Sequence, residues 1–517
     1  MSRERLSRWT LALIFIAAAQ LLCTETARAQ TQATIASMRT QYNTIKTQAK
    51  PTGELKKKFD ALDEQIARAG RSGRSGEQRR LYAQGIALAA GREWTPQVEF
   101  TTSLALRTER VFVDAAKSVG FRLEQIYAPS IELTEPLSVR VALHKAGTGG
   151  GGNQLGEKLQ DAGSFDGVSR DLIDDPLRFD MDLSGVPDGR TIVRTETFQG
   201  GQSLGAATLG IEVHRGLDQR LRQLESGVQQ VKGLDTLLAE VLYPVDYIRN
   251  VDRGRIAIGQ FNYDREIAAA EAALASLKAG KDTFAGKTGD FKRHYDFREA
   301  GEVMPYRLYV PTSYKGDRAY PLVVMLHGNG GTENTFMDGQ NGGLQQLAEE
   351  RGYLVVVPLG YRVDGGYGYN NGSRSAEEMR KLQLSEKDIL NVLELMKKQY
   401  RVDANRTYLA GHSMGGSGTW YLGARHPEPW AALGSFAGAA TPETIPPIAR
   451  TPQFIVHGDA DATVTVDRSR NMSAALRKLG VEHQYIEVPG GTHGNIVGPN
   501  FKPMFDFFDK HRKTQSN

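Results

Sequence analysis

The stretch Gly411–Gly415, read Gly-His-Ser-Met-Gly, constrains the fold of this chain more than any other. A short apolar run, Thr407–Ala410, precedes it and indicates a buried strand, and the first turns of a helix are expected directly after it. A serine at a sharp strand-to-helix turn has a strained backbone and an exposed hydroxyl, and glycines two residues to either side let strand and helix pass closely. The context therefore predicts a nucleophilic serine, Ser413.

A second match to the same loose pattern, Gly201–Gly205 around Ser203, shows why the context matters. It leads into Leu209, Ile211 and Val213, which alternate as in a strand. Because no helix follows it, this stretch is interpreted as a glycine-rich loop between strands, and Ser203 is not expected to be catalytic.

Residues 1–29 are predicted to be a cleaved export signal. Arginines precede a short apolar run, Leu11–Leu22, and Ala27–Ala29 has a small-x-small pattern, so the mature chain should begin at Gln30. The run is short for a bilayer span; an uncleaved anchor or lipidation at Cys23 are the alternatives. We therefore expect a secreted or periplasmic protein with no stable membrane insertion after cleavage.

Composition excludes several classes of function for the mature chain. Cys23 is the only cysteine, so no disulfide, thiol nucleophile or thiolate metal site is expected. Residues 1–29 hold four Lys/Arg and two Asp/Glu, so their removal lowers the net charge from +4 to +2. That small excess makes no case for nucleic acid as a partner. We expect neither a cofactor nor a metal, and the oligomeric state stays open.

The front of the chain changes its hydrophobic period twice. Residues 30–95 and 216–284 have apolar positions at helical intervals, whereas 96–215 has alternating runs such as Leu137, Val139, Val141 and Leu143. Several half-buried strands without long helices suggest a β-sandwich-like domain between two helical segments.

Residues 285–517 alternate short apolar runs with helical patterns. Examples are the strand pattern Tyr320–Leu326 and the helix pattern Ser385–Tyr400. Such alternation over more than 200 residues predicts a doubly wound, mostly parallel sheet, whose ligand sites lie beyond the carboxyl ends of the strands.

Three further motifs follow predicted strands of this sheet. The bend after Leu326 is glycine-rich and can turn backbone N–H groups toward a substrate oxygen. Asp459 and Asp461 both follow the strand Phe454–Val456, and His493 follows the last strand. Ser413, then an aspartate, then His493 is the chain order of the Ser-Asp-His triad.

On these residues, the region 291–512 resembles the α/β hydrolases of the secreted esterase group, which includes feruloyl esterases, polyhydroxyalkanoate depolymerases and predicted peptidases. The resemblance is carried by four motifs: Leu326–Gly331, Gly411–Trp420, His457-Gly458-x-x-Asp461-x-x-Val464 and Gly491–Gly494. It implies that Asp461 rather than Asp459 is the acid, and that the N–H groups of Asn329 and Met414 form the oxyanion hole.

The expected function is hydrolysis of carboxylic esters on aromatic, polysaccharide-linked or polyester substrates through an acyl-enzyme on Ser413. The connection after the predicted strand near Val357 contains Tyr361, Tyr367 and Tyr369 among glycines, and we expect these tyrosines to wall the substrate pocket. Two alternatives remain: a serine peptidase of the same fold, and a polymer- or surface-binding protein with a vestigial hydrolase domain.

Overall fold

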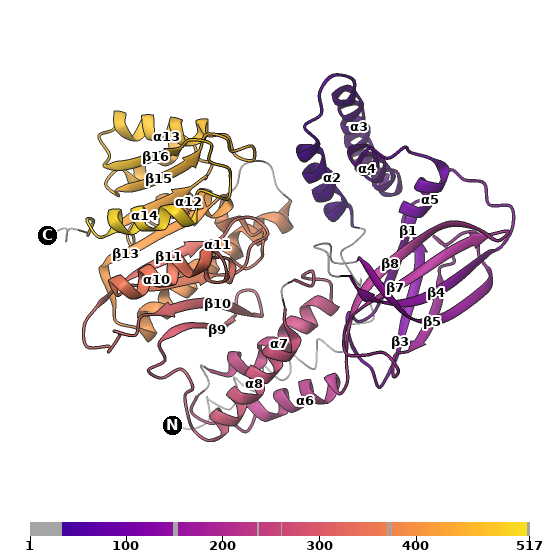
Figure 1. Ribbon diagram of the computed structural model, residues 1–517, viewed down its shortest axis with the longest axis horizontal. Helices are drawn as coiled ribbons and strands as arrows, with labels where there is room; N and C mark the ends of the chain where they lie inside the picture. The colour runs from indigo at the N-terminus through magenta and orange to yellow at the C-terminus, as the bar shows by residue number, and fades with distance from the viewer. Residues whose placement is uncertain are drawn as a thin grey trace. The chain divides into compact units, whose positions relative to one another are not determined.

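The computed structural model describes residues 34–147, 154–234, 237–259, 261–369, 372 and 375–513. The predicted export signal at 1–29 lies outside the described residues. The chain divides into two compact units (Figure 1). The first contains the described residues up to Gln223 together with Tyr247–Asn262, and the second contains Leu224–Asp246 and the chain from Tyr263 onward.

Helices open the first unit, as the helical spacing predicts. Three of them pack through a small core that includes Tyr42, Phe59 and Leu81. The helices are α2 (Ile35–Ala49), α3 (Gly53–Arg71), α4 (Ser75–Ala89) and α5 (Pro96–Ser103). Thr34 caps α2 by accepting a hydrogen bond from the Ser37 N–H at 3.1 Å, which satisfies one of the amides that a helix start leaves unpaired.

Two sheets follow in the first unit and share one apolar core. The three-stranded sheet has the order β1-β3-β6, and the five-stranded sheet has the order β2-β8-β7-β4-β5. Their strands are β1 (Leu104–Thr108), β2 (Phe112–Asp114), β3 (Ser118–Gln125), β4 (Leu137–Ala146), β5 (Leu155–Val168), β6 (Leu177–Asp182), β7 (Gly189–Gln199) and β8 (Gln202–His214).

Alternation fixes which face of the five-stranded sheet is buried. In β4 the apolar residues Val139, Val141 and Leu143 are buried in the core, while Arg140 between them is exposed. The sequence pattern predicts β4, β6 and β8 in this way. Gly200 and Gly201 form the turn between β7 and β8, and Ser203 already belongs to strand β8.

The second unit includes more of the chain than the expected segment that begins at residue 285. Glu240, on α7, accepts from Arg293 Nε at 2.6 Å and lies 2.7 Å from His294 Nδ1, and all three side chains are buried. Glu266, on α8, pairs with Lys292 at 3.2 Å. Buried charges are tolerated only when they are paired, so these contacts tie the helices to the following strand. The helices of this region are α6 (Leu217–Val228), α7 (Leu238–Asp252) and α8 (Tyr263–Lys278).

The predicted doubly wound sheet is confirmed. Eight strands lie in the order β16-β15-β14-β13-β11-β12-β10-β9 (Figure 1). Neighbours from β12 to β16 pair in parallel, and the sequence pattern did not predict β9, which pairs antiparallel with β10. The strands are β9 (Gly289–Phe297), β10 (Glu302–Val310), β11 (Tyr320–Leu326), β12 (Leu354–Pro358), β13 (Val402–His412), β14 (Ala432–Phe436), β15 (Gln453–Gly458) and β16 (His483–Val488).

Helices cover both faces of this sheet. Alternate sheet residues face two separate cores: Val324 and Leu409 belong to one, and Val323 and Tyr408 to the other. The first core is covered by α11 (Ala376–Gln399), α12 (Met414–Arg425) and α13 (Asp467–Lys478), and the second by α9 (Thr335–Asp338), α10 (Gly343–Arg351) and α14 (Phe501–Phe508). Among the described helices, none has the length and apolarity that crossing a membrane would require.

Candidate active site

Ser413 lies at the sharp turn between β13 and α12. Its backbone has φ 58° and ψ −116°, a conformation that non-glycine residues rarely adopt, and its N–H donates to the Phe436 carbonyl at 2.8 Å. A Cβ atom on Gly415 would lie 2.0 Å from the Leu326 carbonyl oxygen, and one on Gly411 would lie 2.5 Å from the Gly415 backbone. The flanking glycines are therefore required by the close crossing of strand and helix.

His493 connects the serine to the acid. It lies in the loop after β16, with Nε2 2.8 Å from Ser413 Oγ and Nδ1 2.7 Å from Asp461 Oδ2. A neutral imidazole that donates from Nδ1 to a carboxylate has Nε2 free to accept the serine proton. The geometry is that of a general base held in one tautomer.

Asp461 is placed to hold that tautomer. Its side chain is completely buried, and its other oxygen accepts from the Thr463 and Val464 amides at 2.8 and 2.9 Å. Burial alone would raise the pKa of Asp461, but the hydrogen bonds from His493 and from these amides outweigh it and hold the pKa below its ordinary value. Asp461 is therefore ionised at neutral pH.

Asp459 has a different role, although it follows the same strand. It is exposed, and its Oδ1 accepts from the Gly490 N–H at 2.7 Å. Its carboxylate thus holds the loop that leads from β16 to His493. Of the two candidate aspartates, only Asp461 meets the imidazole.

Two histidines that the sequence patterns did not single out, the buried His457 and the partly buried His412, support this arrangement. His457 Nε2 donates to the Val464 carbonyl at 2.9 Å and lies 3.2 Å from Asp461 Oδ2. His412 Nε2 donates to the His493 carbonyl at 2.7 Å, and burial lowers the pKa of His412 to about 4, so it is neutral at pH 7. Both histidines lie inside the motifs quoted above, next in sequence to the acid and the serine, and that position could have indicated their role in the site.

The loop predicted to supply one N–H of the oxyanion hole passes beside the serine at Gly328. A Cβ atom on Gly328 would approach the Ser413 Cβ to 3.3 Å, and the exposed Asn329 follows directly. Met414 is the first residue of α12, where helix N–H groups have no partner within the helix. His327 anchors the loop, because its Nε2 lies 2.7 Å from the Leu359 carbonyl.

The prediction that Tyr367 walls the substrate pocket is wrong. Its side chain is completely buried, and its hydroxyl donates to the His327 carbonyl at 3.1 Å. A Cβ atom on Gly418 would lie 2.7 Å from the Tyr367 ring, so the ring packs against α12 beneath the site. Of the other two, Tyr361 is half-buried under the Arg362 guanidinium, 3.8 Å from its ring centroid, and Tyr369 is partly exposed.

A buried carboxyl group fixes the start of this tyrosine-containing loop. Asp388, on α11, accepts from the Tyr295 hydroxyl at 2.5 Å and from the Tyr361 N–H at 2.8 Å. Tyr361 has a positive φ of 65°, which costs backbone energy, so the turn needs such a partner. Burial raises the pKa of Asp388 to about 6.

The described residues contain no cluster of three or more metal-ligating side chains. A mostly parallel sheet with helices on both faces, and with Ser413, Asp461 and His493 after β13, β15 and β16, defines an α/β hydrolase.

Comparison with known proteins narrows the class of the region that contains the serine and the acid. Residues 298–485 match the family described as "Putative esterase". "Putative esterase NocK" of Nocardia uniformis subsp. tsuyamanensis is 28% identical over 187 residues, which are 35% of this chain and 52% of that protein. "Dipeptidyl-peptidase 5" of Porphyromonas gingivalis is 28% identical over 176 residues, which are 33% of this chain and 24% of that protein. "Bifunctional acetylxylan esterase/xylanase XynS20E" of Neocallimastix patriciarum is 28% identical over 164 residues, which are 32% of this chain and 22% of that protein. The chain thus spans about half the length of the first relative and under a quarter of the other two. The matched region is an esterase-type α/β-hydrolase segment.

Proposed function

We propose that this protein is an exported serine esterase that hydrolyses carboxylic esters through an acyl-enzyme. The hydrogen-bonded chain from Ser413 Oγ through His493 to Asp461, within an esterase-type segment, carries the proposal. His493 removes the proton as Ser413 attacks the ester carbonyl, and the N–H groups of Asn329 and Met414 hold the oxyanion. The alcohol leaves with a proton from His493, and water then releases the acid by the same steps.

The substrates we propose are esters of aromatic acids, of polysaccharides or of polyesters. The similarity of this chain to a protein named acetylxylan esterase/xylanase favours esters carried by a polymer. Export follows from the features of residues 1–29, and the mature protein recovered from outside the cytoplasm should begin at Gln30.

Labelling with a fluorophosphonate, followed by a panel of soluble acyl esters, tests the nucleophile. Ser413→Ala should abolish labelling and lower kcat by up to about 10⁶-fold. Ser203→Ala is the matched control, because the Ser203 hydroxyl donates to Glu196 at 2.8 Å in the other compact unit. Labelling that persisted in Ser413→Ala and vanished in Ser203→Ala would overturn the assignment, and a wild-type protein with neither labelling nor turnover would favour a vestigial domain.

A serine peptidase is the second candidate, because the chain is also similar to a protein named dipeptidyl-peptidase. The same residues would serve, but an amine leaves less readily than an alkoxide, so peptidases rely on pockets that orient the chain. We expect kcat/KM to be several orders of magnitude higher for an ester than for the anilide of the same acyl group. Comparable values on one enzyme preparation would move the assignment to peptidase.

A further inference from the structure

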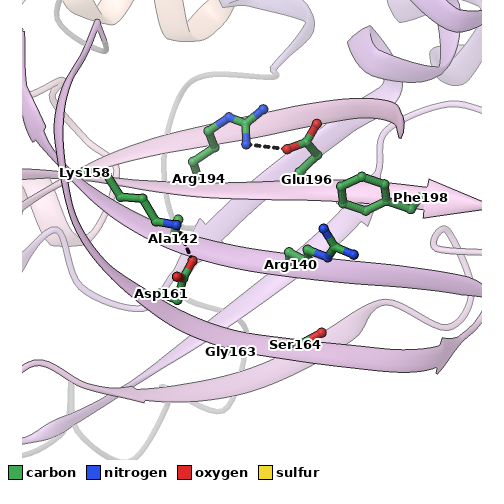
Figure 2. Close-up of a pocket in the computed structure, with 9 residues that line it drawn as sticks. All are labelled: Arg140, Ala142, Lys158, Asp161, Gly163, Ser164, Arg194, Glu196 and Phe198. Carbon is green, nitrogen blue, oxygen red and sulfur yellow. Dashed lines mark hydrogen bonds and ion pairs between the residues drawn. The ribbon is translucent and has the colours of Figure 1, made fainter. Parts of the chain in front are cut away.

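The β-sandwich carries a groove that the proposed chemistry does not use. It lies on the outer face of the five-stranded sheet, is lined by residues of β4, β5 and β7, and has a volume of about 670 Å³ (Figure 2). Clefts of this size hold small ligands or short segments of larger ones. The groove belongs to the first compact unit, whereas Ser413 belongs to the second.

The groove is hollow because short side chains lie between long ones. Three of its lining residues, Ala142, Gly163 and Ser164, are small, and the other six have charged or aromatic side chains. The pairing of β4 with β5 shifts register at several points, one of them between Val141 and Ala142. Such bulges bend a strand and increase its twist, which curves this face of the sheet.

Most charges in the groove are already paired. Lys158 Nζ lies 2.5 Å from Asp161 Oδ1, and Arg194 donates to Glu196 at 2.6 Å, as the dashed lines in Figure 2 mark. Glu196 also accepts from the Ser203 hydroxyl at 2.8 Å. The hydrogen bond from Arg194 is the largest cause of the lowered pKa of Glu196. These two pairs therefore present donors and acceptors with little net charge.

Arg140 is the exception. Its guanidinium lies over the Phe198 ring, 4.6 Å from the centroid, and Figure 2 shows the two side chains together. Arg140 is exposed, and no hydrogen bond or ion pair joins it to another described residue, although its charge contributes to the lowered pKa of Glu196. The stack on Phe198 holds the guanidinium in place while its N–H donors remain open to a ligand.

We propose that this groove binds a polysaccharide that carries carboxylate groups. A planar guanidinium recognises a carboxylate through two parallel hydrogen bonds. The paired side chains Arg194, Glu196, Lys158 and Asp161 offer donors and acceptors together, which suits sugar hydroxyls because each both donates and accepts. The one large apolar side chain of the groove, Phe198, lies under Arg140, so the groove offers an acyl chain little apolar surface. Two of its three cations are already paired, so it lacks the basic field that nucleic acid requires.

Binding of the full-length protein to polygalacturonate, compared with the same polymer after reduction of its carboxyl groups, tests the proposal. Retardation in native gels and calorimetric titration should show binding about tenfold or more tighter to the carboxylated polymer, and weaker as salt rises. Arg140→Ala should weaken this binding by about tenfold or more, and Arg140→Lys by less, because an ammonium keeps the charge but loses the bidentate geometry.

Arg178→Ala is the matched control, because Arg178 is also an exposed arginine and lies on β6 of the other sheet. It should bind the polymer like the wild type, and neither arginine variant should change turnover of a small soluble ester. Equal binding of the two polymers, no retention of the wild-type protein, or the same loss in Arg178→Ala as in Arg140→Ala would each overturn the proposal. Ser413→Ala should retain binding, so failure of the proposed esterase chemistry would be seen separately.

Discussion

Replacing the acid by its amide tests the proposed mechanism most sharply. In Asp461→Asn the single carbonyl oxygen must choose between two sets of donors. In the first orientation, this carbonyl oxygen faces the Thr463 and Val464 amides and keeps both hydrogen bonds, which are 2.8 and 2.9 Å in the wild type. The amide NH₂ then faces His493 Nδ1, where the wild-type carboxylate accepts at 2.7 Å.

The opposite orientation leaves two buried backbone N–H groups facing an NH₂ group. Each buried N–H that loses its acceptor costs about 1–3 kcal/mol, so the first orientation should be the more stable one. His493 then accepts at Nδ1, has its proton on Nε2 and cannot receive the proton of Ser413. A wrong tautomer costs about 10⁴ in kcat, which corresponds to about 5.4 kcal/mol.

Asp459→Asn makes the same chemical change two residues away. Its carbonyl oxygen can still accept from the Gly490 N–H, a bond of 2.7 Å in the wild type, so kcat should stay within about a factor of two. The assay is kcat on a soluble aryl ester with both variants shown to be folded by circular dichroism. A larger loss in Asp459→Asn than in Asp461→Asn, or a loss below tenfold in Asp461→Asn, would refute the reasoning.

Two further predictions concern stability. Glu240→Gln leaves Arg293 and His294 without their buried carboxylate, so the free energy of unfolding in urea should fall by about 3–5 kcal/mol, and a loss below 1 kcal/mol would contradict the buried ion pairs. The pKa of Asp388 is raised to about 6 in the folded protein, so its stabilising contribution is complete below about pH 4 and is lost as the pH rises through 6. The free energy of unfolding of Asp388→Asn, measured relative to that of the wild type, should therefore rise by up to about 3 kcal/mol between pH 4 and pH 7. If the difference between the two proteins stays constant across that range, Asp388 does not titrate there.

The local sequence was enough to predict those strands and turns whose apolar or glycine pattern reflects their burial directly. Apolar runs such as Tyr320–Leu326 give buried parallel strands, and the glycines around Ser413 mark a crossing that larger residues cannot make. Strand β5 was not predicted, because most of its residues are exposed and its sequence has no apolar alternation. The pattern of a half-buried strand exists only where one face meets a core.

Tertiary structure decided everything that depends on which distant residues meet. Asp459 and Asp461 look alike in the sequence, but only the fold shows that one faces Gly490 and the other faces His493. In the sequence Tyr367 resembles an exposed loop tyrosine, but in the fold α12 packs against its ring and buries it. Likewise, only the fold shows that Glu240 pairs with Arg293 and His294 of the α/β unit. Spacing along the chain reports local conformation, whereas burial and pairing across tens of residues arise only when the chain is folded.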